Sequence, residues 1–230
     1  MKPLEWLLGL LGELLLAVVL AGLFVRRRAD SCYSFTIYVM AVLVCEVLIT
    51  GWPAIFHTWE FWVFKEILFA VLKFAIALEL AARTFRAFPG ARSTGRGVSL
   101  LVVVVSLAAV LALPAGTLPE FPELASQVLP RIVNGTIWLF TALAAVILWY
   151  RLPVDLFHKA ILVGFVAFSL VFTVTLNLLE AIGWQVRWLV SYLQSGAYLL
   201  LLGYWGHAAW RPLEGRVRSP EARREATQPM

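Results

Sequence analysis

Several residues that could do chemistry in this chain lie within stretches that are otherwise apolar. The stretch from Trp59 to Arg83 contains Lys65, Glu66 and Lys73. With a helical period of about 3.6 residues, one narrow face of this stretch collects Glu66, Ala70, Lys73, Ala77 and Thr84. A charged side chain that met lipid near mid-membrane would cost about 3 kcal/mol or more. We therefore expect this polar stripe to face other helices or water.

The composition indicates a membrane protein. The chain has 230 residues, of which 61% are hydrophobic and 14% are charged, and its mean hydropathy is +0.84. Ordinary soluble chains are about 45–50% apolar and about 25% charged. Apolar runs of about 20 residues predict helices that cross a lipid bilayer. The basic residues behind the net charge of +5 cluster beside these runs, so we predict no nucleic-acid partner.

The apolar runs predict an all-α, polytopic membrane protein with seven transmembrane helices. The predicted spans are 4–25, 32–51, 59–83, 98–113, 131–150, 156–179 and 187–205. Most of the 19 Lys and Arg residues fall at one set of span ends, which places the N-terminus outside and the C-terminus in the cytoplasm. A seven-helix transmembrane bundle over 1–210 is thus predicted, followed by a disordered basic cytoplasmic tail over 211–230.

Two further features of the first three spans concern helix packing. Small or acidic residues repeat every four positions in the first span, at Gly9, Glu13, Ala17 and Ala21, and this spacing predicts a close packing face. In the second span, Glu46 lies at about the same depth as Lys65. We therefore expect Glu46 to neutralise Lys65.

The sixth and seventh spans each present a polar edge. These edges consist of Ser169, Thr173, Asn177 and Glu180 on one span, and Arg187, Ser191, Gln194 and Tyr198 on the other. Because a short turn joins the two spans, the edges are predicted to face each other, with Glu180 near Arg187 at the outer mouth and Thr173 near Gln194 further in.

Together these residues predict a polar lining that opens outward and closes near Lys73 and Glu13. The candidate ligand-binding residues are Glu13, Glu66, Lys73, Thr173, Asn177, Glu180, Arg187, Ser191, Gln194 and Tyr198. Ionisable residues inside a membrane are candidates for function. The alternative is that the same residues form interhelical hydrogen bonds and ion pairs that only fix packing.

No cofactor is predicted. His158 and His207 both lie near the predicted inner face, but neither has an identifiable supporting ligand, so a shared haem or metal site is a minor alternative. Cys32 and Cys45 lie about 20 Å apart on one predicted helix and cannot pair. The seventh span lacks the Lys that a rhodopsin needs, so we do not expect a rhodopsin. No hydrolase or nucleotide-binding motif is present, so we expect a non-enzymatic protein.

Part of the chain resembles a known group. The segments R-R-R and Y-S-F-T-I-Y, F-W-V-F-K-E-I-L, and A-L-E-L-A-A-R-T-F-R-A-F-P-G-A-R, all within 26–96, resemble a group of uncharacterised bacterial seven-span membrane proteins. The resemblance implies a location in the bacterial cytoplasmic (inner) membrane and brings no site residues. Seven spans in one short chain are also similar to the SWEET sugar transporters, although the helix-kinking prolines of that family are missing here.

These observations favour a sensor or an accessory subunit whose outward polar pocket binds a small ligand or a partner helix. One alternative is a small-solute or proton-coupled transporter that uses Glu66, Lys73 and Glu13. Another is a structural subunit of a larger membrane complex. A transporter needs a polar lining that continues to the cytoplasmic side, whereas Leu199 to Leu202 make that half apolar.

Overall fold

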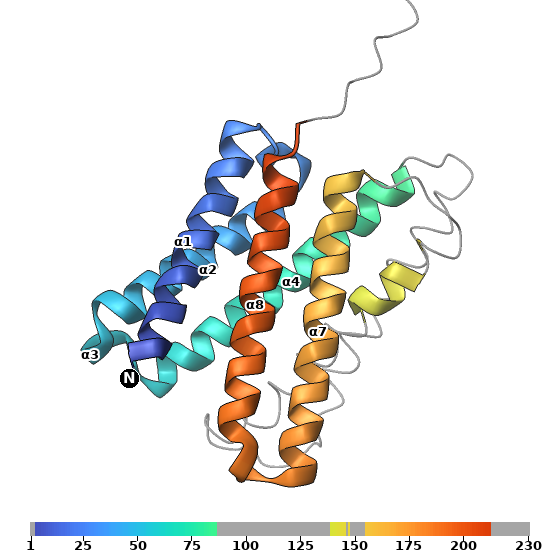
Figure 1. Ribbon diagram of the computed structural model, residues 1–230. Helices are drawn as coiled ribbons and strands as arrows, with labels where there is room; N and C mark the ends of the chain where they lie inside the picture. The colour runs from blue at the N-terminus through green and yellow to red at the C-terminus, as the bar shows by residue number, and fades with distance from the viewer. Residues whose placement is uncertain (1–2, 87–138, 146, 148–154, 213–230) are drawn as a thin grey trace, which may run out of the picture.

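The computed structural model describes residues 3–86, 139–145, 147 and 155–212 (Figure 1). These residues form helices without a strand, which confirms the all-α prediction for the described part. The long helices are α1 (Pro3–Val25), α2 (Tyr33–Gly51), α4 (Trp59–Arg86), α7 (Leu156–Ile182) and α8 (Arg187–Trp210). Short helical turns are η1 (Ala29–Ser31), α3 (Pro53–Phe56) and η3 (Trp184–Val186), and residues 139–145 are also helical.

Three of the described helices are long and apolar enough to cross a membrane. They are α1 over Trp6–Val25, α2 over Tyr33–Gly51 and α7 over Leu156–Leu179. Helices α4 and α8, with 28 and 24 residues, are also long, but α4 carries several charged side chains and α8 is rich in tyrosine, tryptophan and glycine. The structure therefore shows a helical protein with apolar candidate spans. The predicted span 98–113, most of 131–150, and the predicted tail beyond residue 212 lie outside the described residues.

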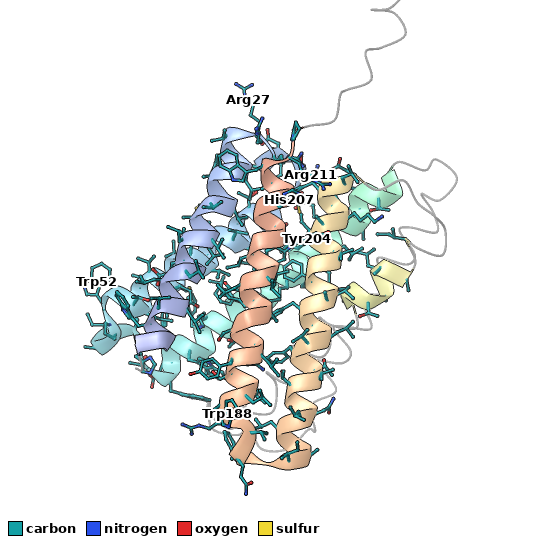
Figure 2. The ribbon with its side chains drawn as sticks, viewed as in Figure 1. Arg27, Trp52, Trp188, Tyr204, His207 and Arg211 are labelled. Atoms are coloured by element: carbon teal, nitrogen blue, oxygen red, sulfur yellow. The ribbon has the colours of Figure 1, made fainter. Side chains whose placement is uncertain are left out.

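The helices alternate in direction and bring two sets of ends together. Helix α8 packs against α1 and α7, and α2 packs against α1 and α4 (Figure 1). At one end, which we call the basic end, the turn at 26–32 contacts residues of α4 and α7 and the residue that follows α8. Figure 2 shows Arg27 and Arg211 at this end and Trp188 near the other. The opposite end contains α3 and η3.

Aromatic side chains fill the core on the side of the basic end. The ring of Phe35 contacts the rings of Phe157, Phe165 and Trp205 edge to face, with centroids 5.8, 6.5 and 5.0 Å apart. Trp205 is only 1% exposed, and its indole N–H donates to the carbonyl oxygen of Ala160 at 3.3 Å. We call Phe35, Phe157, Phe165 and Trp205 the aromatic plug. Because its rings come from α2, α7 and α8, the plug ties these helices together.

Polar contacts fix the turn at the basic end. The guanidinium of Arg83 donates to the carboxylate of Glu79 at 2.7 Å and to the carbonyl oxygen of Asp30 at 2.9 Å. Arg28 is 5% exposed; it donates to the carbonyl oxygen of Arg211 at 2.9 Å and lies over the ring of Phe157. Each arginine thus connects the turn between α1 and α2 to another helix.

The predicted packing face of α1 is wrong. Gly9, Ala17 and Ala21 are exposed in the described structure, and Glu13 is half-buried. The buried face instead consists of Gly12, Leu16, Val19, Gly22 and Leu23. It faces α8, where Gly12 lies against Tyr198 and Gly22 against Trp210. Leucine and valine bury more apolar surface than alanine does, so the larger side chains are the ones turned toward the neighbouring helix.

Candidate functional site

The polar stripe of α4 faces the protein interior, as predicted. Ala70, Ala77 and Thr84 are buried, and Glu66 and Lys73 are half-buried. The exposed face of the same helix carries large apolar side chains, such as Phe64 and Val71. The two charged side chains of the stripe therefore point toward α2, α7 and α8 rather than away from the bundle.

The stripe opens into a cavity at mid-depth, which we call the central cavity. Its volume is about 230 Å³, and α4 faces α7 and α8 across it. The lining residues are Tyr38, Glu66, Phe69, Ala70, Lys73, Phe140, Phe165, Phe168, Ser169, Phe172, Tyr198 and Leu201. Lys73, Ser169 and Tyr198 each lie near the middle of their helices. The cavity thus lies near the midplane of the bundle.

The chemistry of the central cavity is aromatic, with one cation and one anion. Lys73 and Glu66 are the charged residues among the lining residues that the structure describes. Within the described residues, Lys73 forms no ion pair and no hydrogen bond, and the same holds for the hydroxyl groups of Tyr38 and Tyr198. An ammonium group and two phenol groups are therefore available to a ligand. Such a site holds a ligand by one charge contact and by ring stacking.

The aromatic plug closes the central cavity toward the basic end. Phe165 belongs to both, since it lines the cavity and contacts Phe35 and Trp205. Phe140 stacks on Phe165, with centroids 4.6 Å apart. Next to the plug, Gly164 lies directly against Trp205 and Leu201. The described helices thus leave the cavity with an apolar, tightly packed floor.

A second cavity, the lateral cavity, lies between α1, α2 and α8. Its volume is about 440 Å³. The lining residues are Leu8, Gly9, Gly12, Glu13, Leu16, Glu46, Ser191, Tyr192, Ser195, Tyr198 and Leu199. Tyr198 lines both cavities, so the two cavities are adjacent.

The two carboxylates of the lateral cavity have partners. Glu13 accepts a hydrogen bond from the hydroxyl of Thr50 at 2.6 Å, and Glu46 lies 3.7 Å from the ammonium of Lys65. The predicted pairing of Glu46 with Lys65 is confirmed. The structure does not bring Glu13 to Lys73, because Glu13 lines the lateral cavity and Lys73 the central one.

The polar edges of α7 and α8 meet in a different register from the predicted one. Gln194 donates to Thr175 at 3.0 Å rather than to Thr173. Thr175 is 2% exposed, whereas Thr173 is exposed and its hydroxyl donates to the carbonyl oxygen of Ser169 in its own helix. Two residues correspond to about 200° around a helix, so α7 turns a different side toward α8 than the polar spacing indicates.

The remaining predicted site residues are Ser191, Asn177, Arg187 and Glu180. Ser191 lines the lateral cavity, although it is largely exposed. Asn177 and Arg187 are exposed near the opposite end and line neither cavity. The side chain of Glu180 lies outside the described residues, so its predicted contact with Arg187 stays a prediction.

The two histidines have separate partners. Nε2 of His158 donates to the carbonyl oxygen of Ser31 at 2.6 Å, and Nε2 of His207 accepts from Nε of Arg211 at 3.1 Å (Figure 2). In the part of the chain that the structure describes, no group of three or more His, Cys, Asp or Glu side chains is placed to hold a metal ion. His158 thus connects α7 to the turn before α2, whereas His207 contacts the residue that follows the end of its own helix.

The sequence-based predictions did not include most of the aromatic residues that line the central cavity, nor the hydrogen bonds of Glu79 to the first turn of α2. Tyr38 and Phe172 have no polar periodicity to single them out, although aromatic residues recur on the interior faces of α2 and α7. Glu79 lies one turn before Arg83, which is a common spacing for an ion pair, but its contacts to α2 depend on how the two helices cross.

Comparison with protein-family models finds no match for this chain, and neither the curated proteins nor the solved structures show a match.

Proposed function

We propose that this chain is a multi-pass protein of the bacterial inner membrane that binds a small ligand in its central cavity. In this proposal it acts as a sensor or an accessory subunit and carries out no catalysis of its own. The N-terminus lies outside and the basic end lies in the cytoplasm, because arginines at 26–28, 83 and 211 gather at that end of the described helices.

The observation that carries the proposal is the environment of Lys73. An ammonium group without an ion pair among the described residues lies in a cavity lined mainly by aromatic rings. An ionisable side chain in that position is costly unless a partner compensates it, and such residues mark sites of function in membrane proteins. A ligand with an anionic group supplies the compensation.

The aromatic plug favours a receptor over the alternative of a transporter. A transport route has to continue from the cavity to the basic end, but Phe35, Phe157 and Trp205 are all buried there at 1% exposure or less. Opening such a route would separate packed rings from three helices. A cavity with one closed end suits a protein that binds its ligand and passes on a change in helix packing.

A cavity-filling variant tests whether the central cavity binds a ligand. In Ala70→Phe, a ring added to a buried lining residue occupies the space between α4 and α7. The matched control is Ala82→Phe, which adds the same ring to an exposed position of the same helix. Thermal unfolding of the three detergent-solubilised proteins is measured with a panel of ring compounds of about 6–12 non-hydrogen atoms.

The proposal predicts that at least one compound raises the melting temperature of the wild-type protein and of Ala82→Phe but not of Ala70→Phe. Binding that is equal in all three proteins would place the compound elsewhere and would contradict a ligand site in the central cavity. If no compound in the panel raises the melting temperature of the wild-type protein, that result also counts against a ligand site in the central cavity.

A further inference from the structure

The charges and the shape of the central cavity define a ligand class. We infer that it takes a small zwitterion with a ring-sized apolar body, with the anionic group of the ligand at Lys73 and its cationic group at Glu66. This inference rests on the proposed function, since it names the ligand of the same site. An aromatic α-amino acid is the simplest molecule of this class.

The separation of Glu66 and Lys73 supports two contacts rather than one. The two residues lie two turns apart on one face of α4, about 10 Å along the helix axis. Their side chains form no direct ion pair with each other. A charge-assisted hydrogen bond takes about 2.8 Å at each end. Because both side chains line the same cavity, one molecule that carries an ammonium and a carboxylate group can contact both.

The charge balance of the cavity argues for a ligand without net charge. Among the described lining residues there is one cation and one anion, so their net charge is zero when both are ionised. A monoanion would pair with Lys73 and leave Glu66 without a charged partner, and a monocation would do the reverse. A buried charge without a partner costs free energy, so only a zwitterion satisfies both residues.

The volume and the lining set the size of the apolar body. An engineered protein cavity of about 150 Å³ holds one benzene ring. The central cavity, with about 230 Å³, therefore has room for one ring and a short charged segment. The rings of Phe69, Phe168 and Phe172 line the same space, and aromatic pairs prefer stacked or edge-to-face contact. The walls are thus suited to an aromatic body.

Four probes separate the contributions of the two charges. L-phenylalanine carries both charges, 3-phenylpropanoate carries only the anion, 2-phenylethylamine carries only the cation, and 2-phenylethanol carries neither. Binding of each probe to the full-length protein in lipid nanodiscs is measured by calorimetry. The variants are Lys73→Gln and Glu66→Gln, with Glu60→Gln as a control at an exposed position of α4 and with Ala70→Phe as the blocked cavity.

For the wild-type protein, L-phenylalanine is expected to bind at least about tenfold more tightly than any of the other probes, because it alone makes both charge contacts. Lys73→Gln should lose this advantage and still bind 2-phenylethylamine as the wild type does. Glu66→Gln should lose it too and still bind 3-phenylpropanoate. Retained binding of the single-charge probe shows that each variant is folded. Glu60→Gln should behave as the wild type.

Failure of this inference differs from failure of the proposed function. If 2-phenylethanol binds as tightly as L-phenylalanine and Ala70→Phe abolishes both, the cavity binds ligands but is not selective for zwitterions, and the inference is overturned. If Lys73→Gln and Glu66→Gln leave L-phenylalanine affinity unchanged, it is overturned as well. If no probe distinguishes the wild type from Ala70→Phe, both proposals fall. If a variant does not fold, the affinities of the four probes for the wild-type protein still show whether the cavity is selective for a zwitterion.

Discussion

The carboxylate of Glu79 on α4 caps the first turn of α2 by accepting a hydrogen bond from the backbone N–H of Ser34 at 2.8 Å. It also accepts from the N–H of Tyr33 at 3.1 Å and from Arg83 at 2.7 Å. The first N–H groups of a helix have no partner within the helix, and the helix dipole favours a negative charge there. One side chain therefore satisfies the start of α2 and orients an arginine that holds the preceding turn.

Removing this cap is expected to destabilise the bundle. In Glu79→Ala, the first turn of α2 loses its acceptor and Arg83 loses its carboxylate partner, so the free energy of unfolding should fall by about 2 kcal/mol. The change in the free energy of unfolding is measured by SDS titration of the protein in mixed micelles. The control Glu60→Ala removes an exposed carboxylate from the first turn of α4 and should change stability by less than about 0.5 kcal/mol. Equal stability of the two variants would contradict the cap.

A methyl group at Gly164 is expected to disturb the aromatic plug. A Cβ there would lie 2.8 Å from Cδ1 of Leu201 and closer still to the indole nitrogen of Trp205, whereas carbon atoms in contact normally lie about 3.5–4.0 Å apart. Gly164→Ala should therefore cost about 1–3 kcal/mol of stability and shift the fluorescence of Trp205.

The matched control for that variant is Gly203→Ala on α8. A Cβ at Gly203 meets nothing within 4 Å, and alanine is the better helix former. This variant should be as stable as the wild type or up to about 1 kcal/mol more stable. If Gly164→Ala were tolerated as well as Gly203→Ala, the close packing of α7 on α8 would be refuted.

The ion pair between Glu46 and Lys65 is expected to contribute little. The atoms lie 3.7 Å apart, and the side chain of Glu46 is 38% exposed. Polar contacts between helices of a membrane bundle contribute about 0.6 kcal/mol on average. A double-mutant cycle with Glu46→Gln and Lys65→Gln should give a coupling energy of about 0.5 kcal/mol. A coupling above about 2 kcal/mol would show that the pair is far better shielded than its exposure indicates.

The proposed orientation is testable with reporter fusions. A fluorescent protein fused after residue 230 should fold and fluoresce, because it stays in the cytoplasm. Alkaline phosphatase inserted near His57, between α3 and α4, should be active, because it folds on the outer side of the membrane. The reverse pattern would invert the topology and place the opposite end in the cytoplasm.

Much of the helical framework could be predicted from the sequence. The predicted bounds of the first, third and sixth spans agree within a few residues with α1, α4 and α7, because runs of apolar residues end where charged residues begin. The partner of Lys65 was predictable too, since depth along two antiparallel helices depends only on counting residues from a shared turn.

Features that depend on helix rotation and tilt were not predictable. Spacing alone favours Thr173 as the partner of Gln194, but the rotation of α7 presents Thr175. Likewise, the hydrogen bond from Thr50 to Glu13 depends on how α1 packs on α2, which no periodicity reveals. Tyr38 lines the central cavity only because α2 turns this face inward, and an aromatic residue in an apolar run carries no signal of that.

The most direct test of a ligand cavity within a membrane bundle compares two cysteines on α7. In a background with Cys32→Ala and Cys45→Ala, Ser169→Cys places a thiol on the half-buried lining of the central cavity, and Val174→Cys places one on a side chain that is 65% exposed and lines neither cavity. Both are treated in intact membranes with a water-soluble thiol reagent that cannot cross the bilayer.

If the cavity holds water and the exposed face of α7 meets lipid, the less exposed thiol is the more reactive one. We expect Ser169→Cys to be labelled from the outer side at least about tenfold faster than Val174→Cys. Faster labelling of Val174→Cys, or no labelling of Ser169→Cys, would contradict a solvent-reachable central cavity in a membrane-embedded bundle.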